Sequence, residues 1–218
     1  NVSESQIDRF ILDFTNGTID PSAYPDIISW PCNGDAALGE DATMAPYIDV
    51  NQNGVSDPLM GGASPCIQGD QTLYWVFNDN KNAMRETVGG EKLNIQVKAQ
   101  AFAYDCPSVN CPVSELDEAT FYSYEITNKS GQRYTDVYIG NWMDSDLGNF
   151  ADDFVGSDSV LGLAYSYNGN PLDADYGANP PAFGSIILES PDNLGMTSFM
   201  YYNNDFTPRG NPTDAQGF

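Results

Sequence analysis

The stretch from Leu93 to Ala101 constrains the fold of this chain more than any other part of its sequence. Apolar and polar side chains alternate strictly along it, which is the period of a strand with one face on a core and the other in water. The apolar set is Leu93, Ile95, Val97, Ala99 and Ala101, and the polar set is Asn94, Gln96, Lys98 and Gln100. A half-buried strand needs partner strands, so we expect the neighbouring segments to complete a sheet.

Further strand patterns lie on both sides of this one. The run from Thr72 to Phe77 is aromatic and β-branched throughout, which predicts a central strand buried on both faces or nearly so. Phe121–Thr127 and Tyr134–Trp142 are joined by a polar turn and predict an antiparallel hairpin. Later strands are expected at Leu161–Tyr167, Phe183–Leu188 and Phe199–Tyr202. The predicted fold is all-β, an antiparallel β-sandwich with long irregular loops and one short N-terminal helix.

That helix is expected between Ser3 and Phe14, where apolar residues recur at helical spacing behind a Ser-x-x-Gln capping pattern. Prolines then exclude regular structure until about Met44. We expect a single domain over residues 1–218, with a wrapping helix and Pro-rich segment at 1–45, the sandwich at 46–190 and a tail at 191–218. The tail either packs on its own domain or docks on a neighbouring copy as an added strand.

The segment from Asp49 to Asp57 has the ligand spacing of a calcium-binding loop. The pattern D-x-N-x-N-G-x-x-D supplies oxygen atoms at successive ligand positions and a glycine where the chain must turn sharply round an ion. The expected ligands are Asp49, Asn51, Asn53, the Val55 carbonyl and Asp57. An ordinary Asn/Asp/Gly turn is the alternative, but turn chemistry does not require every one of these ligands.

The last ligand position of the loop holds Met60, where a bidentate glutamate is usual. The site therefore needs a carboxylate from elsewhere, and the nearest candidates along the chain are Asp70 and Asp79. With so few charges the affinity is expected to be modest, which suits the calcium-rich exterior of a cell.

A second acidic cluster connects two predicted strands. Its aspartates repel one another unless they bind a cation, because each pair of like charges near 4 Å costs about 1 kcal/mol even in water. Nearby aromatic residues favour a calcium site over a solvated acidic loop, since burial raises the cost of unpaired charge. The candidate ligands are Asp144, Asp146, Asp152, Asp153 and Asp158.

The charge balance restricts the partners of this chain. It has 31 acidic and 8 basic residues and a formal net charge of -23, which disfavours nucleic acid and anionic membranes. Most of the acids are aspartate, so cation binding explains them better than a salt-adapted surface. No apolar run approaches the roughly 20 residues of a membrane span. The chain starts without a secretory signal, which predicts a mature or excised fragment.

Four cysteines and the absence of histidine favour disulfides over a zinc or haem site. We expect Cys32–Cys66 around the loop and Cys106–Cys111 across a short Pro-containing segment, although the sequence leaves other pairings open. Oxidised cysteines together with calcium predict an extracellular or cell-surface location.

Several ordered motifs resemble a module of large secreted Bacteroidetes cell-surface proteins that are exported by the type IX secretion system. The likeness runs from about Ile11 to Leu188, and its motifs are Ile48–Pro58, Gly69–Asp79, Phe121–Ser130, Tyr138–Gly148 and Asp152–Asp158. The resemblance implies export and calcium-dependent folding without assigning a biochemical activity. Gly61-Gly62 departs from the Gly-Asp that is frequent in such modules, and Ser157-Asp158-Ser159 lacks a frequent Cys.

The chemistry of the sequence favours a non-catalytic structural or adhesive module, whose partners are other copies or neighbouring domains of a surface assembly. Without histidine no Ser-His-Asp or Cys-His nucleophile can form. A calcium-dependent carbohydrate-binding module that holds glycans is the alternative. A glycosidase needs a pair of carboxylates, and Glu125 and Glu189 are the glutamates on predicted strands. It is less favoured, because Glu125 alternates outward on its strand and is more simply a solvated residue.

Overall fold

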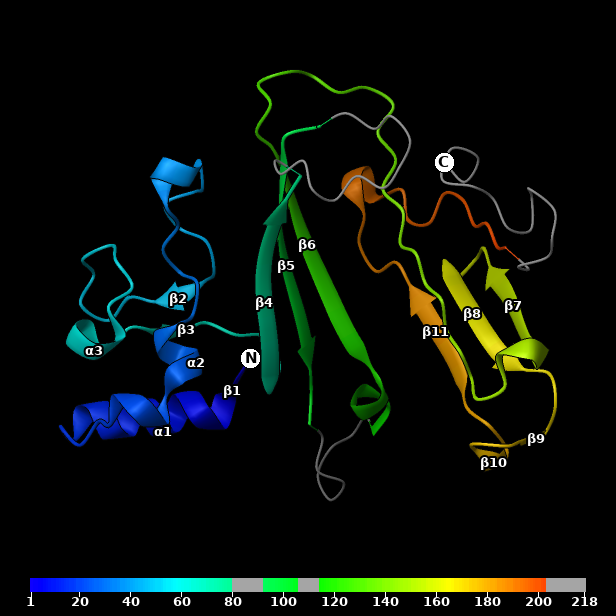
Figure 1. Cartoon of the computed structure of the whole chain (residues 1–218), viewed down its shortest axis with the longest axis horizontal. Helices are drawn as coiled ribbons and strands as arrows, with labels where there is room; N and C mark the ends of the chain where they lie inside the picture. Colours follow the sequence, from blue (N-terminus) through cyan, green and yellow to red (C-terminus); the bar gives the residue numbers. More distant parts are fainter. Residues whose placement is uncertain (80–91, 106–113, 203–218) are drawn as a thin grey trace. The chain divides into compact units, whose positions relative to one another are not determined.

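A computed structural model describes residues 1–79, 92–105 and 114–202 of the chain (Figure 1). The chain divides into two compact units, one comprising residues 1–85 and 90–133 and the other 86–89 and 134–218. Both are rich in antiparallel β-structure, as the sequence predicts. The expectation of one domain over residues 1–218 stays a prediction. Among the described residues, no helix has the length and apolar character needed to cross a membrane.

The first unit begins with β1 (Val2–Ser3) and α1 (Glu4–Thr15). The capping box predicted from the sequence is present, because the Ser3 hydroxyl accepts from the Gln6 N–H and the Gln6 side chain accepts from the Ser3 N–H at 2.9 Å. The apolar stripe of α1 buries Ile7 and Phe10. The predicted helix is therefore confirmed, with its cap.

The Pro-rich wrapping segment follows α1, and the chain from there to β4 (Gln71–Asn78) contains short elements only. They are η1 (Pro21–Ala23), α2 (Pro25–Ile28), η2 (Ala36–Leu38), β2 (Tyr47–Ile48), α3 (Pro58–Gly61) and β3 (Ser64–Pro65). The core of this unit gathers Val2, Ile7, Phe10, Tyr24, Ile27, Trp30, Cys32 and Ala45. The Trp30 ring lies 5.8 Å from that of Tyr74, and the Tyr74 hydroxyl donates to the Met44 carbonyl at 3.0 Å. These contacts hold the wrapping segment on the sheet.

The sheet of the first unit has the strand order β1-β4-β5-β6, all antiparallel (Figure 1). Its long strands are β4 (Gln71–Asn78), β5 (Ile95–Ala103) and β6 (Thr120–Asn128), and η4 (Ser114–Glu118) precedes β6. The strand periods of the sequence predict these three strands correctly.

The polar side of β5 does not face water, contrary to the prediction. Gln96 is 5% exposed, and its amide donates to the Asp41 carboxylate at 3.0 Å. Lys98 pairs with the same carboxylate at 3.2 Å, and Lys129 pairs with it as well. The wrapping segment thus covers this face through an ion network, and the Lys129, Lys98 and Gln96 bonds lower the pKa of Asp41 to about 2.

The opposite face of the same sheet keeps large apolar side chains exposed. Val97, Ala99 and Ala101 are buried along its middle strand. The exposed side chains beside them are Leu73 and Phe77 on β4 and Tyr122, Tyr124 and Ile126 on β6. The prediction that β4 is buried on both faces is therefore wrong.

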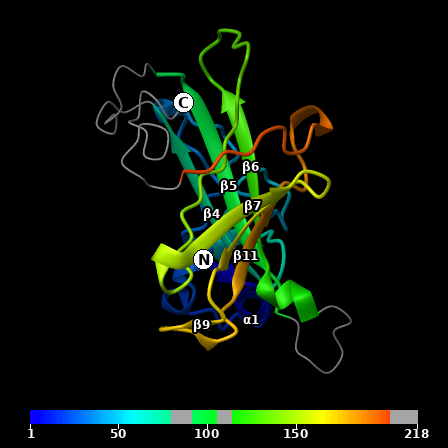
Figure 2. The same cartoon turned by 90° about the vertical axis from the view of Figure 1, so that its right-hand side faces the viewer.

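The second unit contains the three-stranded antiparallel sheet β11-β8-β7 (Figures 1 and 2). Its strands are β7 (Asp153–Asp158), β8 (Leu163–Asn168) and β11 (Ala182–Ile186), and a small pair joins β9 (Leu172–Asp173) to β10 (Gly177–Ala178). Short turns form η5 (Phe150–Asp152) and η6 (Pro191–Asn193). The predicted strands at Leu161–Tyr167 and Phe183–Leu188 are confirmed as β8 and β11.

Two other predicted strands are wrong. Residues 134–142 form no strand and do not pair with β6. Asp136 has a φ of 56°, which interrupts an extended run, and the following Tyr138 is 91% exposed, so no packing rewards an extended strand there. Phe199–Tyr202 is also irregular, although Tyr202 stacks on Trp142 at 5.5 Å.

Candidate metal centre

The predicted calcium loop lies between β2 and α3, and its backbone turns tightly. Gln52 and Gly54 have φ values of 57° and 79°, and glycine adopts this left-handed region without steric cost. The loop ends at Asp57, which directly precedes α3. Gly54 thus provides the sharp turn that its position in the pattern predicts.

The side chains of the loop fold back onto its own backbone. The Gly54 N–H donates to Asp49 Oδ2 at 2.8 Å, the Asn53 N–H to Asn51 Oδ1 at 3.2 Å, and the Val55 N–H to Asn53 Oδ1 at 2.9 Å. These successive bonds hold the side-chain oxygens of Asp49, Asn51 and Asn53 on the backbone of the loop. Each amide or carboxylate oxygen has a second lone pair, so it can accept such a bond and still bind an ion.

The carboxylate of Asp57 contacts two other predicted ligands of the loop. It accepts from the side-chain amides of Asn51 at 3.2 Å and Asn53 at 2.9 Å. Gly61 closes the same space, because a Cβ there would clash with Asn51 Nδ2 and Asp57 Oδ1. The structure therefore brings three of the five predicted ligands into contact.

Asp49 carries an unsatisfied atom in the same loop. Its Oδ1 is buried and has no hydrogen-bond partner among the described residues. An unpaired buried charged oxygen costs more than about 1–3 kcal/mol, and a bound cation removes that cost. The donor set of carboxylates, amides and a backbone carbonyl is what Ca²⁺ accepts in proteins. The residues therefore fit calcium, provided that the Asn51 and Asn53 amides turn their oxygens inward.

Neither additional ligand predicted from the sequence is bonded to this loop. Asp70 accepts from the Asp105 N–H at 2.8 Å, and Asp79 accepts from the Ile95 N–H at 3.0 Å, so both fix the ends of β5. Met60 is 87% exposed. Within the described part of the chain, no three His, Cys, Asp or Glu side chains gather as a metal group. The loop supplies two carboxylates, and its other ligands are neutral.

One anchor of the loop was missed in the sequence. The Asn33 side chain accepts from the Ser56 N–H at 3.2 Å and donates to the Ser56 carbonyl at 3.1 Å. Cys32 beside it is buried, which raises the pKa of its thiol. Cys32 and Cys66 are both free in the structure, so the predicted Cys32–Cys66 disulfide is not formed there. The predicted Cys106–Cys111 pair lies outside the described residues.

The second acidic cluster is dispersed over β7 and its flanks. Asp144 and Asp146 are exposed, whereas Asp158 accepts from the Val160 and Leu161 N–H groups at 2.8 and 3.1 Å and closes a turn. Asp152 pairs with Asn170, and Asp153 accepts from the Leu147 N–H at 2.9 Å. Oδ1 of both Asp152 and Asp153 is buried without a hydrogen-bond partner among the described residues. A cation at these two residues stays a prediction.

The main buried carboxylate of the second unit, Asp173, was not singled out from the sequence. It is 6% exposed and accepts from the Asn149, Asp175 and Tyr176 N–H groups at 2.8–3.0 Å. Gly148 is required beside it, because a Cβ at that position would clash with the carboxylate. The backbone bonds from Tyr176, Asn149 and Asp175 lower the pKa of Asp173 to about 2.

We expect Asp173→Asn to destabilise the second unit at neutral pH and to flatten its acid unfolding. Because the folded pKa is depressed to about 2, the carboxylate stabilises the fold above its unfolded pKa of about 3.9, and this is lost as the pH falls toward 2. Urea unfolding between these pH values tests it, followed by tryptophan fluorescence, to which Trp142 of the second unit contributes. Asp175→Asn, an exposed neighbour, is the control. Parallel pH curves for wild type and Asp173→Asn would contradict this role.

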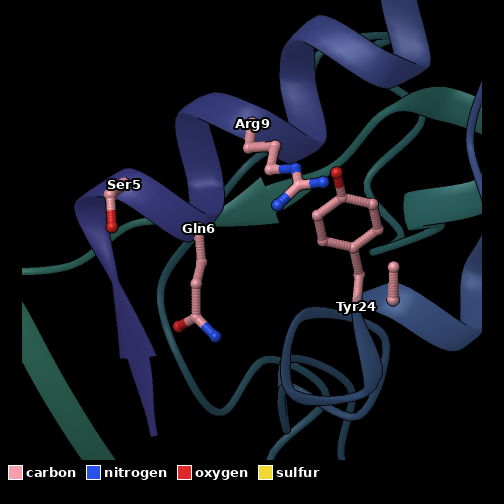
Figure 3. A pocket seen from close by; sticks show the side chains of 5 residues that line it. Ser5, Gln6, Arg9 and Tyr24 are labelled. Carbon is pink, nitrogen blue, oxygen red and sulfur yellow. The ribbon is translucent and has the colours of Figure 1, made fainter.

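A pocket of about 350 Å³ lies beside α1 (Figure 3). It is lined by Ser5, Gln6, Arg9, Ala23 and Tyr24. The Tyr24 hydroxyl donates to Asp13, and the Gln6 side-chain oxygen Oε1 accepts from the Ser3 N–H in the cap of α1. The polar groups of this pocket thus serve the packing of α1, and we assign it no ligand.

No protein-family model matches this chain, and neither a curated protein nor a solved structure matches it.

Proposed function

We propose that this chain is a calcium-stabilised, non-catalytic structural or adhesive module of an extracellular assembly or cell-surface protein. One observation carries the proposal: Asp49 Oδ1 is buried without a hydrogen-bond partner among the described residues, in a loop whose other oxygen-bearing side chains hydrogen-bond to one another and to the loop backbone. A calcium ion supplies that partner. The resemblance to modules of secreted Bacteroidetes proteins supports the same location and the dependence on calcium.

The charge of the chain supports an ion-dependent module. At -23 the chain repels its own copies, so assembly requires local neutralisation. Calcium in the loop neutralises charge where Asp49 and Asp57 lie. A weakly charged loop holds calcium at the concentrations found outside cells, where such sites have dissociation constants of about 10⁻⁴–10⁻³ M.

We also propose the finer fold predicted from the sequence, an antiparallel β-sandwich. Two observations support it, each from one unit. The first sheet has an apolar exposed face that includes Leu73 and Tyr124, and the second has one that includes Phe154 and Tyr167. Apolar sheet faces are stable when another layer covers them. Reduced binding of a hydrophobic dye in calcium, compared with EDTA, is the expected result.

A carbohydrate-binding role is the second candidate, and a row of aromatic rings favours it. Tyr167 lies 5.8 Å from Phe154 and 6.2 Å from Tyr165, on one face of β7 and β8. Gly156 leaves room for the Tyr165 ring, since a Cβ there would clash with it. Exposed aromatic faces suit sugar rings. A glycan-array signal that Tyr165→Ala abolishes would place this role first.

We propose no catalytic role for the two strand glutamates. Glu125 pairs with Lys98 at 3.4 Å, and Glu189 follows β11 as an exposed residue of the other unit. A pair of carboxylates that hydrolyses a glycoside must flank one bond. Hydrolysis of a polysaccharide that Glu125→Gln abolishes would overturn this part of the proposal.

Gly61→Ala tests the proposed calcium site by filling the space beside its candidate ligands. The added Cβ clashes with Asn51 and Asp57. We therefore expect it to displace both candidate ligands and to weaken calcium binding at least about tenfold, which is a loss of about 1.4 kcal/mol. Calorimetric titration with CaCl₂ measures the affinity. Gly140→Ala is the matched control, because a Cβ there meets no atom. Equal affinities of the two variants would refute this site.

A further inference from the structure

The outer edge of β6 is open along its whole length in the described structure. β6 is the terminal strand of its sheet and pairs with β5 only (Figure 1). The Lys129 N–H donates to the Asn94 carbonyl at 2.8 Å, which sets the phase of the ladder. Lys129 and Asn94 are therefore a hydrogen-bonded pair, and such pairs alternate along the ladder with non-hydrogen-bonded pairs. The non-hydrogen-bonded residues of β6 include Tyr122, Tyr124 and Ile126, so their backbone N–H and C=O groups point away from β5.

This edge lacks the features that normally prevent strand pairing. Thr120–Asn128 contains no proline or glycine, and its single charge, Glu125, is paired with Lys98 at 3.4 Å. By contrast, β1 covers the opposite edge of the sheet at Gln71 and Thr72 of β4. An exposed, long and nearly uncharged edge strand is a template for a further strand. In a chain of -23, a locally neutral edge is also where a like-charged copy can approach.

We propose that two copies of this chain pair through β6, antiparallel and around a twofold axis at Tyr124, so that their sheets become continuous. This inference rests on the proposed role in an assembly and names the surface that joins copies. The register places Tyr124 opposite Tyr124 of the second copy and Tyr122 opposite Ile126. All of these residues direct backbone groups outward, so each can form the paired bonds of an antiparallel ladder.

The side chains select this register. Aromatic residues opposite β-branched residues stabilise antiparallel pairs, and like charges directly opposite destabilise them. At the proposed register Glu125 faces Ser123, whereas a twofold axis one residue later would set Glu125 opposite itself. The proposed register also overlaps the full strand Thr120–Asn128.

The flanks of β6 have complementary charges in the same arrangement. Glu115, Asp117 and Glu118 precede the strand, and Lys129 and Arg133 follow it. Antiparallel pairing brings the acidic end of one copy toward the basic end of the other. Two of the 8 basic residues of the chain therefore flank this one strand. A parallel pairing would set like charges together at both ends.

Sedimentation velocity of the full chain in calcium tests the proposal, with concentration varied widely. Tyr124→Pro removes an outward N–H and leaves the bonds to β5 in place, so we expect the dimer dissociation constant to rise about tenfold or more. Tyr124→Lys sets two positive charges opposite each other and is expected to raise the dissociation constant by a similar factor. It tests the interface even if the proline variant misfolds. Tyr138→Lys, at a position 91% exposed and outside β6, is the control and should dimerise as wild type.

Hydrogen exchange gives a residue-level readout of the same interface. On dimerisation the amides of Tyr122, Tyr124 and Ile126 should gain protection, whereas those of Ser123 and Glu125, which face β5, should change little. Pairing through β6 would be overturned, while the assembly role stands, by the following result: the wild type dimerises, both Tyr124 variants dimerise equally well, and the alternating protection is absent. A wild-type chain that stays monomeric in calcium at every concentration would overturn both.

Discussion

Removal of calcium with excess EDTA is expected to lower the thermal unfolding midpoint of this protein by about 5–10 °C. An ion that binds the folded state only, at about 100 times its dissociation constant, adds about 2.7 kcal/mol to the free energy of unfolding. Each kcal/mol shifts the midpoint by about 2–4 °C in a chain of this size. Differential scanning calorimetry in CaCl₂ and in EDTA measures the shift.

Substitutions identify the loop as the origin of that shift. Asp49→Asn removes the charge of the carboxylate whose Oδ1 has no hydrogen-bond partner in the described part of the chain. Asp57→Asn removes the carboxylate that the Asn51 and Asn53 amides contact. In calcium both variants should unfold near the midpoint of the wild type in EDTA. Asp26→Asn, an exposed aspartate of α2, should keep the full calcium increment. Identical midpoints in calcium and EDTA for the wild type would remove the basis of the proposed function.

The elements that the sequence predicts well are those whose signals are local. The capping box and the apolar stripe of α1 lie within twelve residues, and the alternation in β5 and β6 repeats over nine residues each. The bonds within the Asp49–Asp57 loop also arise between residues at most six apart. Interactions between residues that are close in sequence leave a sequence pattern, and this pattern can be recognised without knowing the fold.

The errors concern contacts between distant residues. Gln96 was expected in water, but Asp41, which is 55 residues away, covers it. Periodicity identifies the two faces of a strand, and the face that becomes covered depends on segments elsewhere in the chain. In the same way Asp70 and Asp79 were proposed for the calcium loop because they are near it in sequence. The fold places them at the ends of β5 instead.

Asp173 illustrates a site residue with only a faint sequence signal. Its donors come from Asn149, Asn168 and the turn at Asp175–Tyr176. An aspartate side chain favours an Asx turn with the backbone N–H two residues on, and this much was available from the sequence. The close approach of Gly148 to Asp173 could not be predicted, because no spacing rule connects two residues so far apart in the sequence.

Phe10→Ala is expected to destabilise the first unit by about 3–5 kcal/mol, the range for truncating a buried phenylalanine. Phe10 is 0% exposed, and its ring lies 5.4 Å from Tyr24 edge-on and 6.2 Å from Phe14. Truncation leaves a cavity between α1 and the wrapping segment, and that segment carries the Asp41 network onto the sheet. Urea unfolding at constant calcium measures the loss.

Phe150→Ala provides the comparison that separates burial from residue type. Phe150 is 72% exposed, so its truncation should change the free energy of unfolding by no more than about 0.5 kcal/mol. A large loss for Phe10→Ala beside a small one for Phe150→Ala would show that the burial of Phe10, and not its residue type, stabilises the fold. Equal small losses would mean that α1 packs weakly and that the sheet is stable without it. In that case Asp41, Lys98 and Lys129 would have to hold the wrapping segment, and Asp41→Asn would become the more damaging change.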